Sequence, residues 1–412
     1  MILFFISALF KDLVGQGYSF FLLNKQELYL YFQSKLPTFA NHLEFNCMKI
    51  AILGTRGVPN FYGGFEQFAE FFSVYLAEKG HEVYVYNSHN HPYQEKTFKG
   101  VNILHQYDPE HKIGTAGQFI YDLNCILDSR KRNFDIILQL GYTSSSIWCK
   151  LLPKKPLIIT NMDGLEWKRT KYSKAVQKAL LFAEKLAVKS SDYLVSDSIG
   201  IQNYIQKKYK KDSTYIAYGA NQFTHPEEAI LSQYHVAPNH FNMILARLEP
   251  ENNIETILDG VVLSNDKTIM LVIGNHNTRF GNYLKEKFQS TPTIRFVGAV
   301  YNLEHLDNLR HFSNLYFHGH SVGGTNPSLL EAMASKALII AHKNEFNSAI
   351  LKENAYYFSN AEEVKKIITE IKKNDNLRLI QNNFEAIANE YNWNTINGKY
   401  VQLFEDCITK NN

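Results

Sequence analysis

Short apolar runs alternate with longer helix-like stretches along this chain, and this alternation limits the fold more than any other feature. The runs are three or four residues long, which suits buried strands of a parallel sheet. They fall at 50–53, 83–86, 136–138, 157–159 and 193–195, and again at 243–246, 270–273, 294–297 and 338–341. Strands spaced by helices indicate doubly wound α/β sheets. The sequence therefore predicts two such sheets in tandem.

A polar stretch with two prolines, from about 220 to 238, separates the two series of strands. The 412 residues also suit two domains better than one. We assign residues 48–222 to a first Rossmann-like domain and 223–390 to a second. Residues 391–412 are expected to form a C-terminal helix able to cross back to the first domain. Helices are expected at about 253–265, 302–312 and 327–335, with 361–410 helical throughout.

Residues 1–47 are rich in aromatic residues and show no clear period, whereas at Met48 the sequence changes abruptly to MKIAILGTRG, an apolar run followed by glycines. The apolar run Ile2–Phe10 has no basic leader and no small-residue cleavage site. We interpret 1–47 as a non-native or accessory extension, with a weak membrane-surface segment as the alternative.

The bulk composition excludes some classes of function. The hydrophobic fraction of 45% and charged fraction of 20% are typical of a globular protein. A net charge of +3 gives no argument for nucleic acid, so no nucleic-acid partner is expected. The four cysteines are scattered without metal-ligand spacing, which favours a reducing cytoplasm.

The first candidate site is a glycine-rich loop after the opening strand. Its candidate residues are Gly54, Arg56, Gly57, Gly63 and Gly64. Glycines let the backbone approach a ligand, and a helix N-terminus with a nearby arginine favours an anion or an acceptor. An ordinary βα turn is the alternative. The spacing is not GxGxxG and no acid follows the second strand, which argues against a dinucleotide dehydrogenase.

The second candidate site follows the strand 157–160 and contains Asp163 and Glu166 beside Trp167. Carboxylates at the carboxyl edge of a sheet can accept paired hydrogen bonds from sugar hydroxyls. The alternative makes Asp163 a turn residue and Glu166 a helix cap. We favour a functional role for Asp163 and leave Glu166 open.

The third candidate site follows the first strand of the second half. Arg247 stands at the strand end, and Asn252 and Asn253 precede the next helix. A cation at this position suits a diphosphate leaving group. In the alternative, Arg247 pairs with Glu249 or Glu251 on the surface.

The fourth candidate site is the run from His318 to Met333. Asn326 followed by Pro327 is a typical helix start, and Gly323, Gly324 and Thr325 leave the preceding backbone open to an anion. Glu331 lies one turn inside the helix, where it could accept hydrogen bonds from ribose hydroxyls. The alternative is a capped core helix with a solvated Glu331. His318 and His320 lack a third ligand, so no metal site is predicted.

These motifs resemble glycosyltransferase family 4, which has the GT-B architecture of two Rossmann-like domains facing across a cleft. The resemblance covers about 48–400. GGTNPSLLEAM (323–333), GTRGVPNFYGGFE (54–66) and DGLEWKR (163–169) resemble a rhamnosyltransferase-like subgroup. The family's first signature glutamate falls on Gly323, and its usual lysine falls near Asn253, so both are replaced here.

The resemblance implies site roles. Arg247 matches a diphosphate-binding arginine, Glu331 a ribose-binding glutamate, and Asp163 lies near a catalytic-site histidine of many relatives. Asp163, Arg247 and Glu331 are therefore the expected catalytic residues. The expected donor-binding residues are Arg247, Asn252, Asn253, Gly298, Gly323, Gly324, Thr325, Asn326 and Glu331.

The resemblance also implies a reaction. It is retaining, metal-independent transfer of a sugar, with rhamnose as the best single guess, to a lipid-linked or glycan acceptor in surface polysaccharide biosynthesis. The donor would be a dTDP- or UDP-linked sugar, with no separate cofactor. Another hexose or deoxyhexose donor is the alternative. A catalytically silent GT-B protein that binds sugar nucleotide or scaffolds other enzymes stays open, as does a GT-B epimerase or phosphorylase.

A basic amphipathic stretch runs from Leu165 to Ser191, with seven Lys or Arg residues, including Lys171, against two acids. Such a helix can rest on an anionic membrane surface. A solvated basic face packed on the sheet is the alternative. The expected location is the cytoplasm, with peripheral attachment to the inner face of the membrane as a hypothesis.

Overall fold

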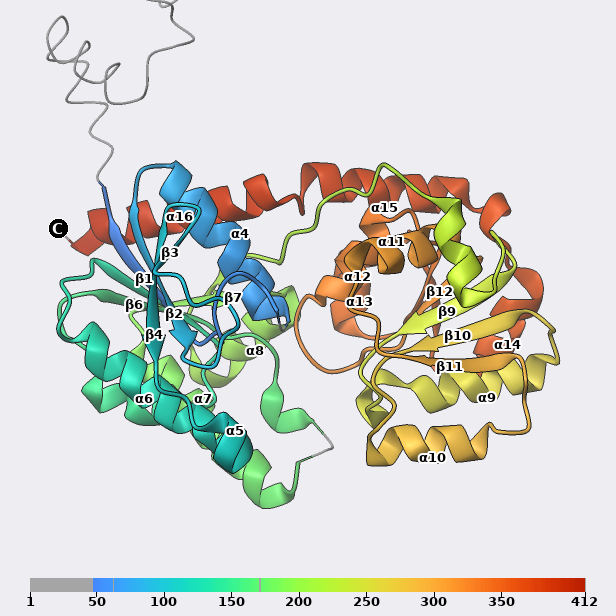
Figure 1. Ribbon diagram of the computed structural model, residues 1–412, viewed down its shortest axis with the longest axis horizontal. Helices are drawn as coiled ribbons and strands as arrows, with labels where there is room; N and C mark the ends of the chain where they lie inside the picture. Colours follow the sequence, from blue (N-terminus) through green and yellow to red (C-terminus); the bar gives the residue numbers. More distant parts are fainter. Residues whose placement is uncertain (1–46, 62, 170–171, 412) are drawn as a thin grey trace, which may run out of the picture. The chain divides into compact units, whose positions relative to one another are not determined.

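The computed structural model describes residues 47–61, 63–169 and 172–411. The expected extension, residues 1–47, lies outside this range except for Cys47. Residues Met48–Asn412 form a compact unit. Within it, two α/β lobes each surround their own sheet, called here the N-lobe and the C-lobe (Figure 1).

The N-lobe sheet has eight strands in the order β3-β4-β2-β1-β5-β6-β7-β8. All neighbours are parallel except β3 and β4. The strands are β1 Lys49–Leu53, β2 Glu82–Ser88, β3 Thr97–Phe98, β4 Val101–Gln106, β5 Ile136–Leu140, β6 Leu157–Asn161, β7 Tyr193–Ser196 and β8 Thr214–Tyr215. The helices are α4 Gly64–Glu78, α5 Glu110–Ile113, η1 Gly114–Ala116, α6 Gly117–Ser129, η2 Ser146–Leu151, η3 Glu166–Lys168, α7 Lys174–Ser190 and α8 Ile199–Tyr209.

The C-lobe sheet has six parallel strands in the order β11-β10-β9-β12-β13-β14. They are β9 Phe241–Leu245, β10 Ile269–Ile273, β11 Ile294–Gly298, β12 Leu315–His318, β13 Ile339–His342 and β14 Tyr356–Phe358. The helices are η4 Glu228–Tyr234, η5 Pro250–Asn252, α9 Ile254–Ser264, α10 Arg279–Lys287, α11 Leu303–Phe312, α12 Pro327–Ala334, α13 Glu345–Leu351, α14 Ala361–Glu370, η6 Lys373–Asp375, α15 Leu377–Asn389 and α16 Trp393–Asn411. The predicted fold class, two parallel-sheet α/β domains, is confirmed.

The central strand β1 shows why an uninterrupted apolar run forms here. Ile50 and Ile52 point to one face of the sheet and pack with Phe68 and Phe72 of α4. Ala51 points to the other face and joins a cluster that includes residues of α6. Both faces are covered by helices, so the strand needs apolar side chains at every position.

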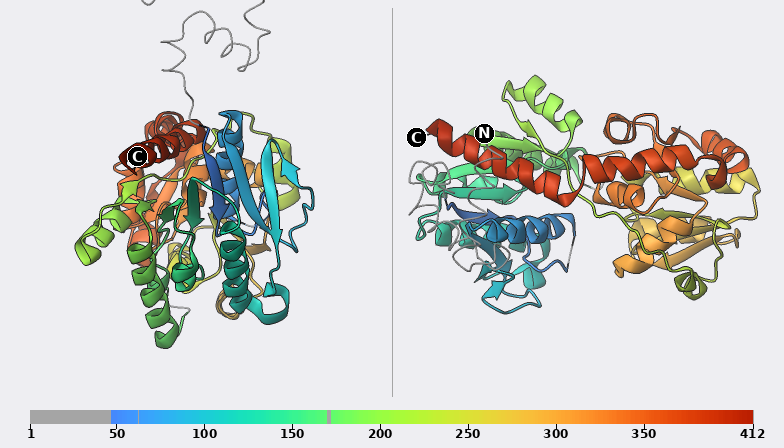
Figure 2. Two further views of the ribbon diagram at one scale, coloured as in Figure 1. Left: turned by 90° about the vertical axis from the view of Figure 1, so that its left-hand side faces the viewer. Right: turned by 90° about the horizontal axis from the view of Figure 1, so that it is seen from above.

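The C-terminal segment is less continuous than expected. Instead of one helix over 361–410, it forms α14, η6, α15 and α16, with breaks near 371–376 and 390–392. The last helix, α16, crosses to the N-lobe and packs along α4 (Figure 2). Trp393 stacks on Phe71 with 4.6 Å between ring centroids, and Phe404 meets Phe72 edge to face. The core of the N-lobe therefore includes side chains from the end of the chain.

Each sheet reverses its strand order once. In the N-lobe the chain builds outward from β1 through β2, then returns to place β5 on the other side of β1. In the C-lobe the same reversal separates β10 and β12 on the two sides of β9. Open α/β sheets bind ligands beyond the carboxyl ends of the strands at such switch points. The topology therefore points to a ligand crevice beyond β1 and β5, and another beyond β9 and β12.

Candidate active site

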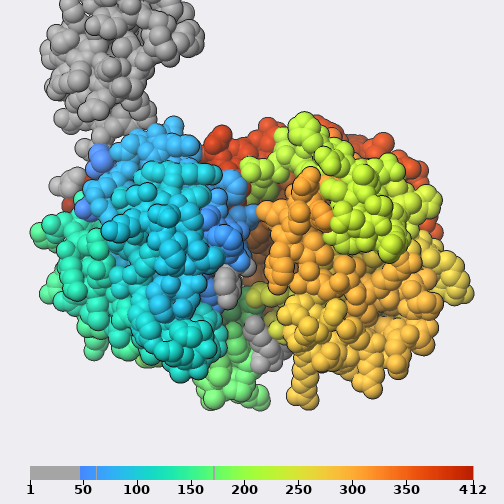
Figure 3. All heavy atoms as spheres, viewed as in Figure 1, coloured from blue at the N-terminus to red at the C-terminus, as the bar shows by residue number. Residues whose placement is uncertain are grey.

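One cavity of about 1190 Å³ receives residues from both switch points. It lies between the lobes, where Figure 3 shows a hollow in the surface. The N-lobe contributes residues 54–56 after β1 and 141–145 after β5. The C-lobe contributes residues 246–247 after β9 and 319–320 after β12. The crevice beyond β1 and β5 and the crevice beyond β9 and β12 thus open into the same cavity. This cavity is the candidate active site.

Most residues expected at the site from the sequence line this cavity. They are Gly54, Arg56, Gly63, Gly64, Asp163, Glu166, Arg247, Asn252, Gly323, Gly324, Thr325, Asn326 and Glu331. They come from segments as far apart as β1 and α12, and the fold brings them together.

Three expected residues do not line the cavity, and each has a structural role instead. Gly57 has a φ of 133°, and a Cβ there would fall 2.3 Å from the side chain of Asn87. Asn253 has a φ of 50° and donates from its side-chain amide to the Gly319 carbonyl at 2.7 Å. Gly298 ends β11 with a φ of 93°. The structure thus places these three residues outside the lining of this cavity, and their expected contact with a ligand stays a prediction.

Arg56, expected to favour an anion or an acceptor, has a carboxylate partner in the structure. Its Nε and Nη2 donate to the two oxygens of Glu110 at 3.0 and 2.7 Å. A bidentate pair of this kind offsets the arginine charge and fixes its orientation. Arg56 lines the cavity, but it does not add a net positive charge for a phosphate.

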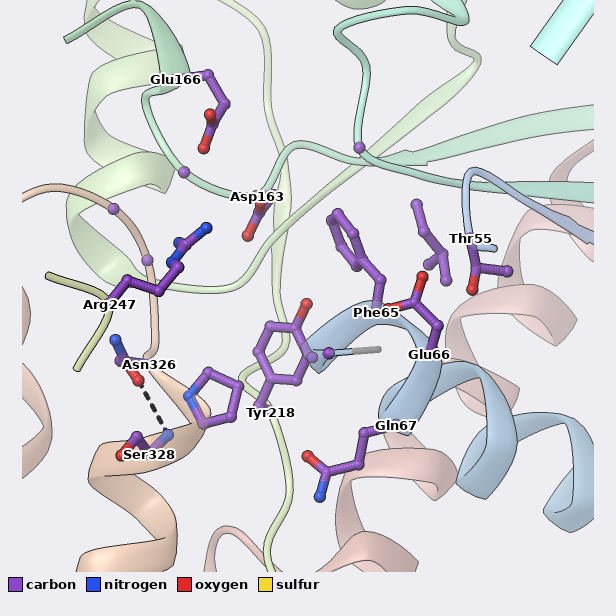
Figure 4. A pocket seen from close by; sticks show the side chains of 18 of the residues that line it. Thr55, Phe65, Glu66, Gln67, Asp163, Glu166, Tyr218, Arg247, Asn326 and Ser328 are labelled. Carbon is purple, nitrogen blue, oxygen red and sulfur yellow. Dashed lines mark hydrogen bonds between the residues drawn. The ribbon is translucent and has the colours of Figure 1, made fainter. Parts of the chain in front are cut away.

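Arg247 keeps the environment expected of an anion-binding residue. Within the described part of the chain, no carboxylate forms an ion pair with its guanidinium. Figure 4 shows its side chain reaching toward Asp163 of the N-lobe. The surface pairing with Glu249 or Glu251, left open from the sequence, is absent among these residues. A guanidinium aimed into a cavity without a protein partner is suited to a bound anion.

Asp163 lies opposite Arg247, on the segment after β6. Its backbone N–H donates to Asn161 Oδ1 at 3.0 Å and its φ is 33°, so the turn considered from the sequence exists. Burial raises the pKa of Asp163, against the opposing effects of the Gly164 N–H, Arg169 and Arg247. A turn thus holds this carboxyl group at the edge of the cavity.

Glu166 forms an ion pair with Arg169, whose Nη2 lies 2.5 Å from Glu166 Oε1. Burial raises the pKa of Glu166, while the arginine lowers it. Arg169 also lines the cavity and was not expected from the sequence, although it is the last residue of the DGLEWKR motif.

The loop before α12 presents a helix N-terminus to the cavity. The Asn326 side chain accepts from the Ser328 N–H at 2.9 Å, and Pro327 is the first helical residue (Figure 4). Gly323 has a φ of 132°, a conformation that favours glycine. A Cβ on Gly324 would fall 1.8 Å from Asp197 Oδ1 in the N-lobe. Backbone N–H groups and the helix dipole here favour an anion.

Glu331 is held by a residue that the sequence reading missed. Arg310 of α11 is fully buried, and its Nη2 lies 2.5 Å from Glu331 Oε2. Its Nη1 also pairs with Asp307 at 2.8 Å. The alternative of a solvated Glu331 is therefore wrong, because one of its oxygens is tied to a buried arginine. Leu306, Leu309 and Arg310 share the helical spacing of a core face, which was the signal available in the sequence.

The two histidines before the loop are neutral near pH 7. Burial lowers the pKa of His318 to about 3 and that of His320 to about 4. His320 Nδ1 lies 3.0 Å from Asn252 Oδ1, which fixes its ring. Among the described residues, no group of three or more His, Cys, Asp or Glu side chains is arranged to hold a metal ion.

The N-lobe side of the cavity carries acids that the sequence reading also missed. Asp122 of α6 is 6% exposed and accepts from Ser144 Oγ at 2.5 Å. Burial raises the pKa of Asp122 to about 7. Glu66 of α4 is also 6% exposed and accepts from the Arg56 N–H at 2.9 Å. Asp122 shares a helical face with buried Cys125 and Ile126, an unusual place for an acid and a usable sequence signal.

Two sequence families match parts of the chain. Residues 237–386 match the family described as Glycosyl transferases group 1, so the C-lobe contains a domain of that group. Residues 47–221 match a family described as a domain of unknown function, DUF1972. A comparison with curated protein sequences gives no match. Within the described residues, no helix is long and apolar enough to cross a membrane.

Solved structures with the same fold include several glycosyltransferases. A glycosyltransferase from Rickettsia africae aligns with a TM-score of 0.67 at 16% identity, over 88% of this chain and 99% of that one. Sucrose-phosphate synthase from Thermosynechococcus elongatus aligns with a TM-score of 0.71 at 15% identity, over 88% and 100%. HepE from Anabaena, in complex with UDP and glucose, gives 0.66 at 14% identity, over 87% and 100%. The chain therefore has the GT-B fold.

Proposed function

We propose that this chain, whose C-lobe contains a Glycosyl transferases group 1 domain, is a retaining glycosyltransferase. It moves a sugar from a nucleoside-diphosphate sugar to a glycan or lipid-linked acceptor. The observation that carries the proposal is the single cavity lined by both switch points. Transfer between two substrates needs two adjoining binding places, and this geometry provides them.

The two sides of the cavity differ in charge, which assigns one substrate to each. The C-lobe side presents Arg247 and the N-terminus of α12, both suited to a diphosphate. The N-lobe side carries mainly carboxyl groups and hydroxyl groups, suited to sugar hydroxyls. This difference supports our assignment of the donor to the C-lobe and of the acceptor to the N-lobe.

The reaction needs stabilisation of the leaving group above all. The bond between the sugar carbon and the diphosphate oxygen breaks, and a bond to the acceptor oxygen forms. The acceptor proton ends on the released nucleoside diphosphate. Arg247 and the α12 backbone stabilise the charge that develops on the diphosphate, and no metal is assigned a role in this step. Asp163, across from Arg247, can accept a hydrogen bond from a sugar hydroxyl.

The donor is proposed to be a dTDP- or UDP-linked sugar, with rhamnose as the sugar that the DGLEWKR and GGTNPSLLEAM motifs favour. HepE, which shares the fold, was solved with UDP and glucose, and this supports a nucleoside diphosphate as the bound group. Glu331 is proposed to bind the ribose, and its place in the cavity lining, with Arg310 fixing one of its oxygens, supports this role.

Thermal unfolding with nucleotides tests the proposal first. Purified protein is heated with UDP, dTDP, GDP, ADP and their sugars. A ligand at 100 times its Kd stabilises the folded state by about 2.7 kcal/mol, so the right donor should raise the Tm measurably. The stabilising donor is then incubated with sugar acceptors, and the product is identified by mass spectrometry and by the anomeric coupling in its NMR spectrum.

Each outcome separates the candidates. Transfer with retained configuration supports the proposal, and an inverted product contradicts the retaining mechanism. Nucleotide binding without turnover would favour the silent GT-B protein, which the replacements at Gly323 and Asn253 keep open. Product formation with no acceptor, or with orthophosphate, would favour an epimerase or a phosphorylase. No nucleotide binding at all would sink the assignment.

Peripheral membrane attachment is proposed for the exposed face of α7. Phe182 is 59% exposed there, and Lys178 and Lys174, four and eight residues before it, are exposed on the same face of the helix. Apolar and basic side chains on one exposed helix face suit a surface of anionic lipid. Lys171, part of the same basic stretch, lies outside the described residues.

Liposome flotation tests this attachment. The native chain should float with vesicles rich in phosphatidylglycerol, and the double variant Lys174→Glu/Lys178→Glu should not. The control double variant Lys366→Glu/Lys372→Glu changes two exposed lysines of the C-lobe and should float like the native chain. Equal flotation of all three, or of none, would contradict the attachment.

A further inference from the structure

The N-lobe side of the cavity contains more carboxyl groups than cations. The acids that line it are Glu66, Asp108, Glu110, Asp122, Asp163 and Glu166. Among the described residues, its only cations are Arg56 and Arg169. Each arginine already pairs with one of these acids, Arg56 with Glu110 and Arg169 with Glu166. This side of the cavity therefore holds no uncompensated positive charge for a phosphate.

Asp122 shows that this region is built to receive a ligand. Its side chain lines the cavity although the residue is only 6% exposed. Oδ2 accepts from Ser144, and no other hydrogen bond to this carboxyl group occurs in the described residues. The other oxygen, Oδ1, is not among the buried side-chain atoms that lack a partner, so it stays accessible from the cavity, where a ligand hydroxyl or a water can donate to it. Its position beyond β1 and β5 is where an open sheet binds its ligand.

The remaining lining of this region suits a sugar ring. Gln118, Thr143 and Ser144 supply side chains that can donate or accept hydrogen bonds. Phe61, at 61% exposure, and Phe65 supply aromatic surface to the same cavity. Polar groups that fix orientation beside apolar faces are typical of small-molecule sites.

We propose that this N-lobe region binds the acceptor as an uncharged sugar and excludes acceptors whose reactive end carries a phosphate. A phosphate placed here would face several carboxyl groups and no unpaired cation among the described N-lobe residues of the cavity, so the ionised carboxylates would repel it without a compensating ion pair. Sugar hydroxyls would instead donate to these carboxylates. The chain thus extends a sugar that is already in place, and a different class of reaction attaches the first sugar to any lipid phosphate. This inference rests on the proposed function.

Acceptor competition on the full chain tests the inference. With one active donor, transfer is measured to an uncharged disaccharide glycoside, to the same disaccharide bearing a phosphate beside the reactive hydroxyl, and to a short polyprenyl phosphate. The kcat/KM for the uncharged acceptor should be at least about tenfold higher than for either phosphorylated one. A poorly compensated charge weakens binding by an amount of free energy that corresponds to a factor of about ten.

Two variants identify the residues responsible. Asp122→Asn keeps the size of the side chain and should raise the acceptor KM about tenfold while UDP affinity, measured by calorimetry, stays unchanged. Glu110→Gln removes the negative charge beside Arg56 and should shift the preference toward the phosphorylated disaccharide. Glu78→Gln changes an exposed acid on α4 outside the cavity and should match the native chain in every assay.

The results distinguish this inference from the proposed function. Preference for a phosphorylated acceptor, or an unchanged acceptor KM in Asp122→Asn, overturns the inference and leaves the glycosyltransferase intact. Nucleotide binding with no transfer to any of the three acceptors also overturns it. Failure to bind any nucleotide would instead remove the proposed function on which it rests.

Discussion

In the proposed reaction, Arg247 is the side chain that we expect to contribute most to stabilising the leaving group. It faces the cavity with no ion pair in the described residues, whereas Arg56, Arg169 and Arg310 are each paired with a carboxylate. An arginine with a protein partner has little charge left for a substrate. The charge of Arg247 is therefore available to an anion in the cavity, which the proposal identifies as the departing diphosphate.

Arg247→Ala should lower kcat by about 100-fold or more, because a preorganised charge at the leaving group acts mainly in the transition state. Steady-state kinetics with the active donor measure this. Arg279→Ala, an exposed arginine of the same lobe outside the cavity, serves as the control and should keep native activity. A native kcat in Arg247→Ala would show that another group stabilises the diphosphate.

Glu331 is a poorer target for the same test. Its partner Arg310 is fully buried, so Glu331→Ala would leave a buried guanidinium without its closest carboxylate. Loss of one member of a buried pair commonly costs about 3–5 kcal/mol. Reduced activity in that variant would thus mix a lost ligand contact with a weakened fold.

The raised pKa of Asp122 predicts that the free energy of unfolding depends on pH. Burial raises its pKa from the ordinary value of 3.8 to about 7, so the folded carboxyl stays protonated where the unfolded one has ionised. Its contribution to stability is therefore present below pH 3.8 and lost as the pH rises to about 7. Relative to the native chain, Asp122→Asn should gain stability between pH 4 and 7 and then level off. Urea unfolding of both proteins across this range checks it, and a constant difference would contradict the raised pKa.

Sequence patterns indicated many individual site residues, most of them in the loops that follow a strand or precede a helix. Gly54, Asp163 and Arg247 could be placed because strand ends of a parallel sheet share one edge. Asp122 and Arg310 lie inside helices, where a charged residue on a core face carries no indication of its partner. The partners come from other elements, Ser144 from the loop after β5 and Glu331 from α12, and only the folded chain brings them together.

Helix α12 connects the loop at the cavity to the core of the C-lobe. Its start was predictable, since Asn326 and Pro327 form a familiar N-terminal pair, and the structure has the Asn326 cap on the Ser328 N–H. The same side chain thus stabilises the helix and fixes the backbone that faces the cavity.

Asn326→Ala should lower the free energy of unfolding by about 1 kcal/mol, the usual effect of losing an N-cap. It should also weaken UDP binding, because the first turn of α12 would be less well ordered. Calorimetry with UDP and urea unfolding measure the two effects. Asn360→Ala, which removes the cap of α14 away from the cavity, should lower stability alone. Equal loss of UDP affinity in both variants would deny α12 a special role.

Strands β4 and β12 were not predicted from the apolar runs of the sequence, and they show where such patterns fail. β12 has the short run Leu315–His318, flanked by polar residues on one side and glycine on the other, and β4 has three apolar and three polar residues without a regular alternation. Short or irregular segments carry a weak signal alone. Neighbouring strands decide their conformation, since β12 lies between β9 and β13, and β4 between β2 and β3.

Helix α16 links the two lobes, because it follows the C-lobe in sequence and packs on α4 of the N-lobe. Tyr400 and Phe404 are almost fully buried against α4, and Asn161 of β6 donates to the Tyr400 hydroxyl at 3.0 Å. Amphipathic periodicity could indicate a helix at the end of the chain. The surface that it covers depends on the arrangement of the lobes, which no local pattern contains.

Phe404→Ala should lower the free energy of unfolding by about 3–5 kcal/mol, because a large buried ring leaves a cavity in the N-lobe core. Leu377→Ala, at a position 62% exposed on α15, should change it by less than about 0.5 kcal/mol. Urea unfolding followed by circular dichroism compares them. Similar small losses in both would mean that α16 adds little to the N-lobe.

The return of α16 has a consequence for a chain that has been cut. A single proteolytic nick between β8 and η4 would separate the sequence into two fragments, yet the second fragment carries Trp393, Tyr400 and Phe404, which fill the interior of the first. The fragments should therefore remain together and elute from gel filtration as one species of native size. The division of the molecule into lobes therefore differs from the order of the sequence, because residues of α16 complete the core of the N-lobe, which is formed mainly by the first half of the described chain.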